Sequence, residues 1–178
     1  HCQCRRQRQM CIRDRLRTTQ EKDQIIFGKK AEQKRRYVSS SVTEDQKYLI
    51  ISAANSTSGN ELYLINHLDE NPEIKTINDD LSIDVYLLDS LDDELFLVTN
   101  NNADNQKIIS VQATKPSLDN SKDLIPEQDS VMSPSSSGGY IFVELMQTAI
   151  SKTFQYDFSG KLIREVNLPG IGSVSPIS

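Results

Sequence analysis

The chain has 178 residues, a formal net charge of −5, 37% hydrophobic residues and no tryptophan. This length is sufficient to bury the core of one domain, and no apolar run approaches the roughly 20 residues of a membrane-spanning helix. The acidic balance, and the lack of aromatic residues interleaved with the basic run from Lys29 to Arg36, predict neither nucleic acid nor a membrane as a partner.

The first fifteen residues, HCQCRRQRQMCIRDR, differ from the rest of the chain. They hold all three cysteines and five arginines against one aspartate, a net charge of +4 that leaves −9 for residues 16–178. The spacing of Cys2, Cys4 and Cys11 does not give the paired C-x₂₋₄-C pattern of a zinc site. A disordered tail is one interpretation, but MCIRDR is also the translation of the end of a transposase-type sequencing adaptor.

We therefore expect residues 1–15 to be a non-native, adaptor-derived segment, which is excluded from reasoning about the fold. The remainder has no cysteine, and a chain without thiols suits oxidising and reducing surroundings equally. In this interpretation the native N-terminus is missing, so the sequence does not decide whether the protein is cytoplasmic or periplasmic. The sequence predicts no metal site and no cofactor.

From residue 37 onward, three units of four short apolar strands follow one another. The first reads YVSSSVT from residue 37, KYLIIS at 47–52, ELYLIN at 61–66 and EIKTIN at 73–78; the second reads DVYLLDS from 84, ELFLVT at 94–99, KIISVQ at 107–112 and KDLIPE at 122–127; the third reads SVMSPSS from 130, GYIFVE at 139–144, KTFQYD at 152–157 and LIREVN at 162–167. Polar stretches AANSTSGN, NNNADNQ and MQTAIS separate the second and third strands, and they predict hairpin turns.

The strands repeat with a constant period. Tyr48, Leu95 and Tyr140 are 47 and 45 residues apart, and the next strand repeats in step with the first series. A two-sheet sandwich has equally short strands, but four antiparallel strands every 40–50 residues indicate propeller blades. We therefore expect an all-β fold, a partial β-propeller of three four-stranded antiparallel blades. Residues 16–178 form this incomplete domain, with blades at about 37–78, 84–128 and 130–169 and the start of a further blade at 170–178.

Several of these stretches resemble the prolyl oligopeptidases, serine peptidases that cleave short peptides after proline. The resemblance is carried by VTEDQKYLIISAANSTSGNELY at 42–63, LVTNNNADNQKIISVQATKPS at 97–117, LIPEQDSVM at 124–132 and YDFSGKLIREVNLPGIGSVS at 156–175. It departs at Arg17, where the family usually has glycine. The resemblance implies a seven-bladed propeller that restricts access to an α/β-hydrolase domain, which would lie outside this chain.

Candidate site residues come only from this resemblance. It implies that Tyr37 and Thr57 line the pocket for the residue two before the substrate proline; alternatively, Tyr37 packs in the blade core and Thr57 stabilises its turn. No G-x-S-x-G nucleophile motif occurs, and His67 is the only histidine after His1, so we expect no Ser/Asp/His triad and an inactive fragment. The Asp79–Asp80 pair lacks the pattern of a calcium loop.

Three functions remain open from the sequence. The first is the substrate-gating propeller of a prolyl oligopeptidase-like serine endopeptidase, whose partners are short proline-containing peptides and the missing α/β-hydrolase domain. The second is a noncatalytic β-propeller that serves as a protein-binding scaffold. The third is an oligopeptidase that is specific for basic residues.

Overall fold

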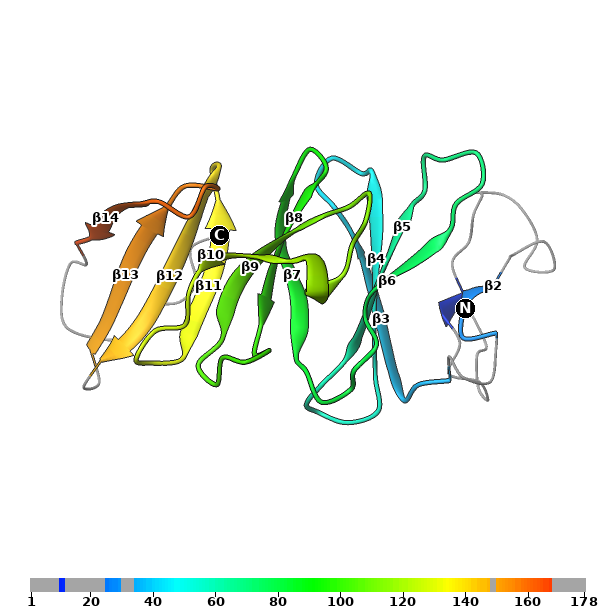
Figure 1. The fold of residues 1–178 in the computed structure, drawn as a ribbon, viewed down its shortest axis with the longest axis horizontal. Coiled ribbons are helices and arrows are strands. Elements are labelled where there is room, and N and C mark those ends of the chain that lie inside the picture. Colours follow the sequence, from blue (N-terminus) through cyan, green and yellow to red (C-terminus); the bar gives the residue numbers. More distant parts are fainter. Residues whose placement is uncertain (1–9, 12–24, 30–33, 148–149, 168–178) are drawn as a thin grey trace, which may run out of the picture.

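The fold consists of three antiparallel β-sheets that follow one another along the chain (Figure 1). The computed structural model describes residues 10–11, 25–29, 34–147 and 150–167, and within these ranges it contains no α-helix. A small pair of strands, β1 (Met10–Cys11) and β2 (Ile25–Phe27), lies beside the first sheet. The predicted fold class, an all-β partial propeller with three four-stranded antiparallel blades, is confirmed.

Each blade holds four strands in chain order. Blade 1 contains β3 (Tyr37–Val42), β4 (Tyr48–Ala54), β5 (Glu61–Asn66) and β6 (Ile74–Asn78); blade 2 contains β7 (Val85–Leu91), β8 (Glu94–Thr99), β9 (Lys107–Gln112) and β10 (Lys122–Ile125); blade 3 contains β11 (Met132–Ser137), β12 (Tyr140–Gln147), β13 (Ile150–Tyr156) and β14 (Leu162–Val166). In the part of the chain that the structure describes, a 3₁₀ turn at Leu118–Asn120 precedes β10.

The third hairpin differs from its prediction. MQTAIS was expected to form a polar turn, but β12 continues through Gln147 and β13 begins at Ile150, with Met146 paired to Ser151. Unlike the first two turns, this stretch contains no Gly, Asn or Asp to end the ladder early, so strand pairing extends into it. The strand β2 was not predicted, and the expected start of a further blade at 170–178 lies outside the described residues.

Apolar side chains fill the seams between neighbouring blades. Strands β4 and β8 are buried on both faces, which explains their continuous apolar sequences. One seam joins blades 1 and 2 and contains Tyr48, Ile50, Leu62, Leu64, Ile77, Val85, Leu95, Leu97, Ile109, Val111 and Ala113. The other joins blades 2 and 3 and contains Val98, Ile108, Ile125, Met132, Ile141, Val143 and Leu145.

Hydrogen bonds of polar side chains join blades 1 and 2 at the end of the seam where β7 begins. The Asn60 side chain acts like a neighbouring strand: its Nδ2 donates to the Val85 carbonyl at 2.8 Å, and the Val85 N–H donates to its Oδ1 at 3.0 Å. The Asp84 carboxylate accepts from the Gly59 N–H at 2.6 Å and from Asn100 Nδ2 at 3.1 Å. These bonds give partners to the Gly59 N–H and to the N–H and carbonyl of Val85.

A second polar contact joins the same blades at their opposite end. The Asp93 carboxylate lies in the β7–β8 turn, forms an ion pair with Lys47 and accepts a hydrogen bond from the Tyr48 hydroxyl at 2.5 Å. The Lys47 ammonium and the Tyr48 hydroxyl stabilise the charged carboxylate and lower the pKa of Asp93 below its usual value. Blade 1 therefore holds blade 2 at both ends of their seam.

This lowered pKa predicts a pH-dependent stability contribution from Asp93. The Asp93 carboxyl has a lower pKa in the folded chain than in the unfolded chain. Its contribution to stability is therefore complete above the ordinary Asp pKa of about 3.9 and is lost as pH falls through the folded-state pKa. We expect Asp93→Asn to unfold at a lower urea concentration than the parent chain at pH 7, and the difference to disappear in strong acid. Urea titrations across this range measure it, with the neighbouring Asp92→Asn as the control. A difference that is independent of pH would contradict the prediction.

Candidate functional site

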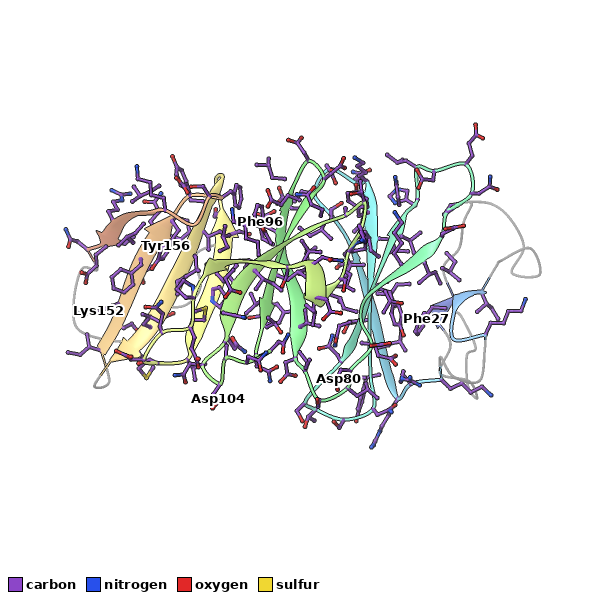
Figure 2. All side chains as sticks on the ribbon, viewed as in Figure 1. Phe27, Asp80, Phe96, Asp104, Lys152 and Tyr156 are labelled. Atoms are coloured by element: carbon purple, nitrogen blue, oxygen red, sulfur yellow. The ribbon has the colours of Figure 1, made fainter. Side chains whose placement is uncertain are left out.

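The candidate site lies at one end of blade 1, on its first strand, β3. Tyr37 opens this strand and pairs with Ala54, near the end of β4. The turn that follows β4 contains Thr57, so the two residues implied by the resemblance lie at the same end of the blade. Asp80 and Asp104 lie in connections at this end of blades 1 and 2, along the lower edge of Figure 2.

Tyr37 is exposed rather than packed in the blade core. Its side chain is 49% accessible to solvent in this chain, which favours a surface position over the alternative in which it packs in the blade core. The guanidinium carbon of Arg36 lies 5.2 Å from the centre of its ring, a cation–π distance. An accessible aromatic ring with a cation beside it offers a flat contact surface for a ligand.

Thr57 is also exposed, within the turn between β4 and β5. The internal hydrogen bonds described for this turn join Ser56 and Ser58: Ser56 Oγ donates to the Ser58 carbonyl at 2.7 Å, and the Ser58 N–H donates to Ser56 Oγ at 3.4 Å. Among the described residues, no hydrogen bond joins Thr57 to the rest of the turn. The alternative in which Thr57 stabilises the turn therefore has no support from the described contacts.

A partly buried ion pair positions the segment that leads into β3. Arg35 Nε donates to Glu61 Oε2 at 2.9 Å, and a second guanidinium nitrogen contacts Oε1. Glu61 is only 4% exposed, and a buried carboxylate needs such a charge-assisted, forked partner. Since Arg35 is two residues before Tyr37, this pair fixes where the aromatic ring emerges from the blade.

Sequence reasoning missed this ion pair. Arg35 was only one residue of the basic run from Lys29 to Arg36, and Glu61 was only the first residue of a predicted strand. The signal that was available is the charge of Glu61 at the start of an otherwise apolar strand. Burial, followed by the negative charge of Glu61, raises the pKa of Tyr63 to about 12, so this neighbouring phenol stays protonated at neutral pH.

The chemistry of this surface suits contact with a ligand rather than bond breaking. It presents an aromatic ring, a hydroxyl group and a guanidinium group. His67 lies in the turn after β5 and is exposed. Within the described ranges, no cluster of three His, Cys, Asp or Glu side chains is arranged to hold a metal ion, and no helix has the length and apolarity to cross a membrane.

Comparison with known proteins places the chain in a family. Residues 2–178 match the model of the prolyl oligopeptidase N-terminal β-propeller domain. The chain is 42% identical over 159 residues to a prolyl endopeptidase of Elizabethkingia miricola and 37% identical over 161 residues to one of Elizabethkingia meningoseptica. These alignments cover 89% and 90% of this chain but only 22% and 23% of the relatives, so the chain spans less than a quarter of their length.

Solved structures share the fold. Prolyl oligopeptidase B from Galerina marginata, bound to a 35mer hydrolysis and macrocyclization substrate, superposes with a TM-score of 0.77 at 22% identity, covering 93% of this chain and 24% of that one. A structure from a study of two prolyl endopeptidases gives a TM-score of 0.74 at 24% identity, with coverage of 89% and 23%. The chain therefore belongs to the prolyl oligopeptidase family, through its N-terminal β-propeller domain.

Proposed function

We propose that this chain is part of the propeller of a serine endopeptidase that cleaves short peptides after proline. The family match over residues 2–178 carries this proposal, and the relatives named prolyl endopeptidases support it. In this proposal the propeller has seven blades and restricts access to an α/β-hydrolase domain. The nucleophile, base and acid then belong to that domain, outside this chain.

Within this enzyme, we propose that Tyr37 and Thr57 contact the residue two before the substrate proline. Their exposure at one end of blade 1 supports this role, as does the ion pair that fixes the segment before Tyr37. The ring would pack against a bulky side chain, and Thr57 would add a polar contact. Such groups orient a bound peptide and do not take part in the bond-breaking step.

The reaction type is tested with the full-length gene product that carries this chain. We expect cleavage of fluorogenic peptides that end in Gly-Pro, and a kcat/KM at least about tenfold lower for matched peptides that end in Gly-Arg, a difference of about 1.4 kcal/mol in transition-state binding. The opposite preference would support the oligopeptidase that is specific for basic residues. A gene product that cleaves neither peptide would favour a noncatalytic scaffold and would overturn the proposal.

The role of Tyr37 is tested with Tyr37→Ala in the same enzyme. Loss of one aromatic contact of about 1–2 kcal/mol predicts a roughly 5- to 30-fold lower kcat/KM for peptides with phenylalanine two before the proline. Peptides with glycine at that position should be affected much less. Tyr140→Ala is the matched control, because Tyr140 is 40% exposed on blade 3. Equal losses for both peptides would contradict a contact at this position.

A further inference from the structure

A recess opens between blades 1 and 2 next to the candidate site. It has a volume of about 240 Å³ and lies between β3 and β7. Its lining includes the hydroxyl-bearing Ser39, Ser41 and Ser52 and the apolar Ile50, Leu62 and Leu87. None of the described residues that line it is charged, which makes it unlike the acidic remainder of the chain.

The strand register connects this recess with Tyr37. Tyr37, Ser39 and Ser41 alternate along β3 and pair with Ala54, Ser52 and Ile50 of β4. Side chains two residues apart lie on the same side of a strand, about 6.6 Å from each other. Ile50 belongs to the seam with blade 2, so this side of β3 faces that blade. A peptide in contact with Tyr37 thus reaches the recess within a few residues.

A bulge in β7 lies beside the recess. Leu87 pairs with Leu97 and Asp89 pairs with Phe96, so Leu88 has no partner in β8. The Leu88 carbonyl instead accepts a hydrogen bond from Ser136 Oγ of β11 at 3.3 Å. A bulge bends its strand, and this one joins β7 to blade 3 while the recess remains on the side of blade 1.

The walls of the recess combine an apolar floor with available hydroxyl groups. Ile50 and Leu62 are 3% and 1% exposed and form part of the seam. Ser39 and Ser41 are exposed, and neither hydroxyl is hydrogen-bonded within the described part of the chain. Ser52 Oγ already accepts from Asn60 Nδ2 at 3.1 Å. Ser39 and Ser41 are therefore free to bond the peptide groups of a ligand.

The volume of the recess and its uncharged lining indicate which kind of group can occupy it. A volume of about 240 Å³ exceeds the roughly 150 Å³ cavity that holds benzene but falls below the roughly 300 Å³ of the smallest ligand pockets. It therefore suits one side chain, and an uncharged lining would leave a charged group without a partner. We propose that the recess is a subsite for one uncharged apolar side chain, such as phenylalanine, of a peptide that hydrogen-bonds to Ser39 and Ser41. The choice of a peptide as the ligand rests on the proposed function.

The test uses the 178-residue chain and NMR titration with N-acetyl-phenylalanine amide. We expect saturable shifts of the amide signals of Ser39, Ser41 and Leu87, and at least tenfold weaker binding of N-acetyl-lysine amide. Ser39→Leu fills the recess and should abolish these shifts. Ser133→Leu, at an exposed position on the corresponding strand of blade 3, should retain them. Unchanged signals from the other blades will show that both variants are folded.

Two results would overturn the subsite: no saturable shifts with the phenylalanine probe, or shifts that survive Ser39→Leu. Either result leaves the proposed reaction standing if the full-length gene product still cleaves after proline. Conversely, a chain that binds the probe as expected, within a gene product that cleaves no peptide, would overturn the proposed function but retain the recess as a side-chain site.

Discussion

Replacement of Gly59 by alanine is expected to lower the free energy of unfolding by about 3–5 kcal/mol. Gly59 has φ +73°, where an alanine loses about 1–2 kcal/mol. A Cβ there would also lie 1.7 Å from the Leu81 carbonyl oxygen, so the β6–β7 connection would have to move. That movement would strain the hydrogen bonds of Asn60 and Asp84, each with a net contribution of about 1 kcal/mol.

Gly138→Ala is the matched control for this substitution. Gly138 also has a positive φ, +58°, but a Cβ there would have no atom within 4 Å. We expect it to lower the free energy of unfolding by only about 1–2 kcal/mol, from backbone strain alone. Urea denaturation followed by circular dichroism measures both variants. Equal losses would show that the contact between Gly59 and Leu81 does not hold the two blades together.

Phe96→Ala is expected to cost about 3–5 kcal/mol of stability, the usual range for a large aromatic residue removed from a core. Phe96, in β8, is fully buried. Its ring stacks on Phe158 of blade 3, with centroids 4.7 Å apart and planes inclined by 5°; Figure 2 labels Phe96 on the side of blade 2 that faces blade 3. This loss of stability has three sources: less apolar surface is buried, a cavity is left in the core, and the ring contact between Phe96 and Phe158 is removed.

A double-mutant cycle separates the contact between the rings from simple burial. Phe158→Ala should cost less than Phe96→Ala because Phe158 is only partly buried. If the rings stabilise each other, the double variant should lose about 1 kcal/mol less stability than the sum of the losses of the two single variants. Phe96→Leu retains most of the apolar burial and should lose chiefly the stacking. Strict additivity would mean that Phe158 does not stabilise the seam between blades 2 and 3.

The repeating strands could be predicted because propeller blades impose a period on the sequence. The strands Glu61–Asn66, Glu94–Thr99 and Lys107–Gln112 begin and end where the apolar runs do. Gly, Asn and Asp marked the first two turns correctly. The third hairpin is also present, but its turn is shorter than the predicted MQTAIS because this stretch lacks such residues and strand pairing extends into it. The origin of residues 1–15 stays a prediction, which resequencing of the parent locus tests.

Contacts between residues far apart in the sequence could not be predicted. Arg35 and Glu61 are 26 residues apart, and Tyr48 and Asp93 are 45 apart; nothing local to either pair indicates the other partner. The recess lies beside the bulge at Leu88, and the sequence DVYLLDS contains no glycine or other sign of that bulge. Tyr37 and Thr57 were named only through a family resemblance, and their exposure emerged from the fold.

Photo-crosslinking most directly tests whether Tyr37 contacts the substrate. p-Benzoylphenylalanine is placed at position 37 or, as a control, at position 140 of the full-length gene product, and each protein is irradiated with a short proline-containing peptide. Mass spectrometry then locates the adducts. We predict a crosslink from position 37 to the residue two before the proline, and none from position 140. Equal labelling from both positions, or no peptide adduct at position 37, would contradict a substrate-facing role for blade 1.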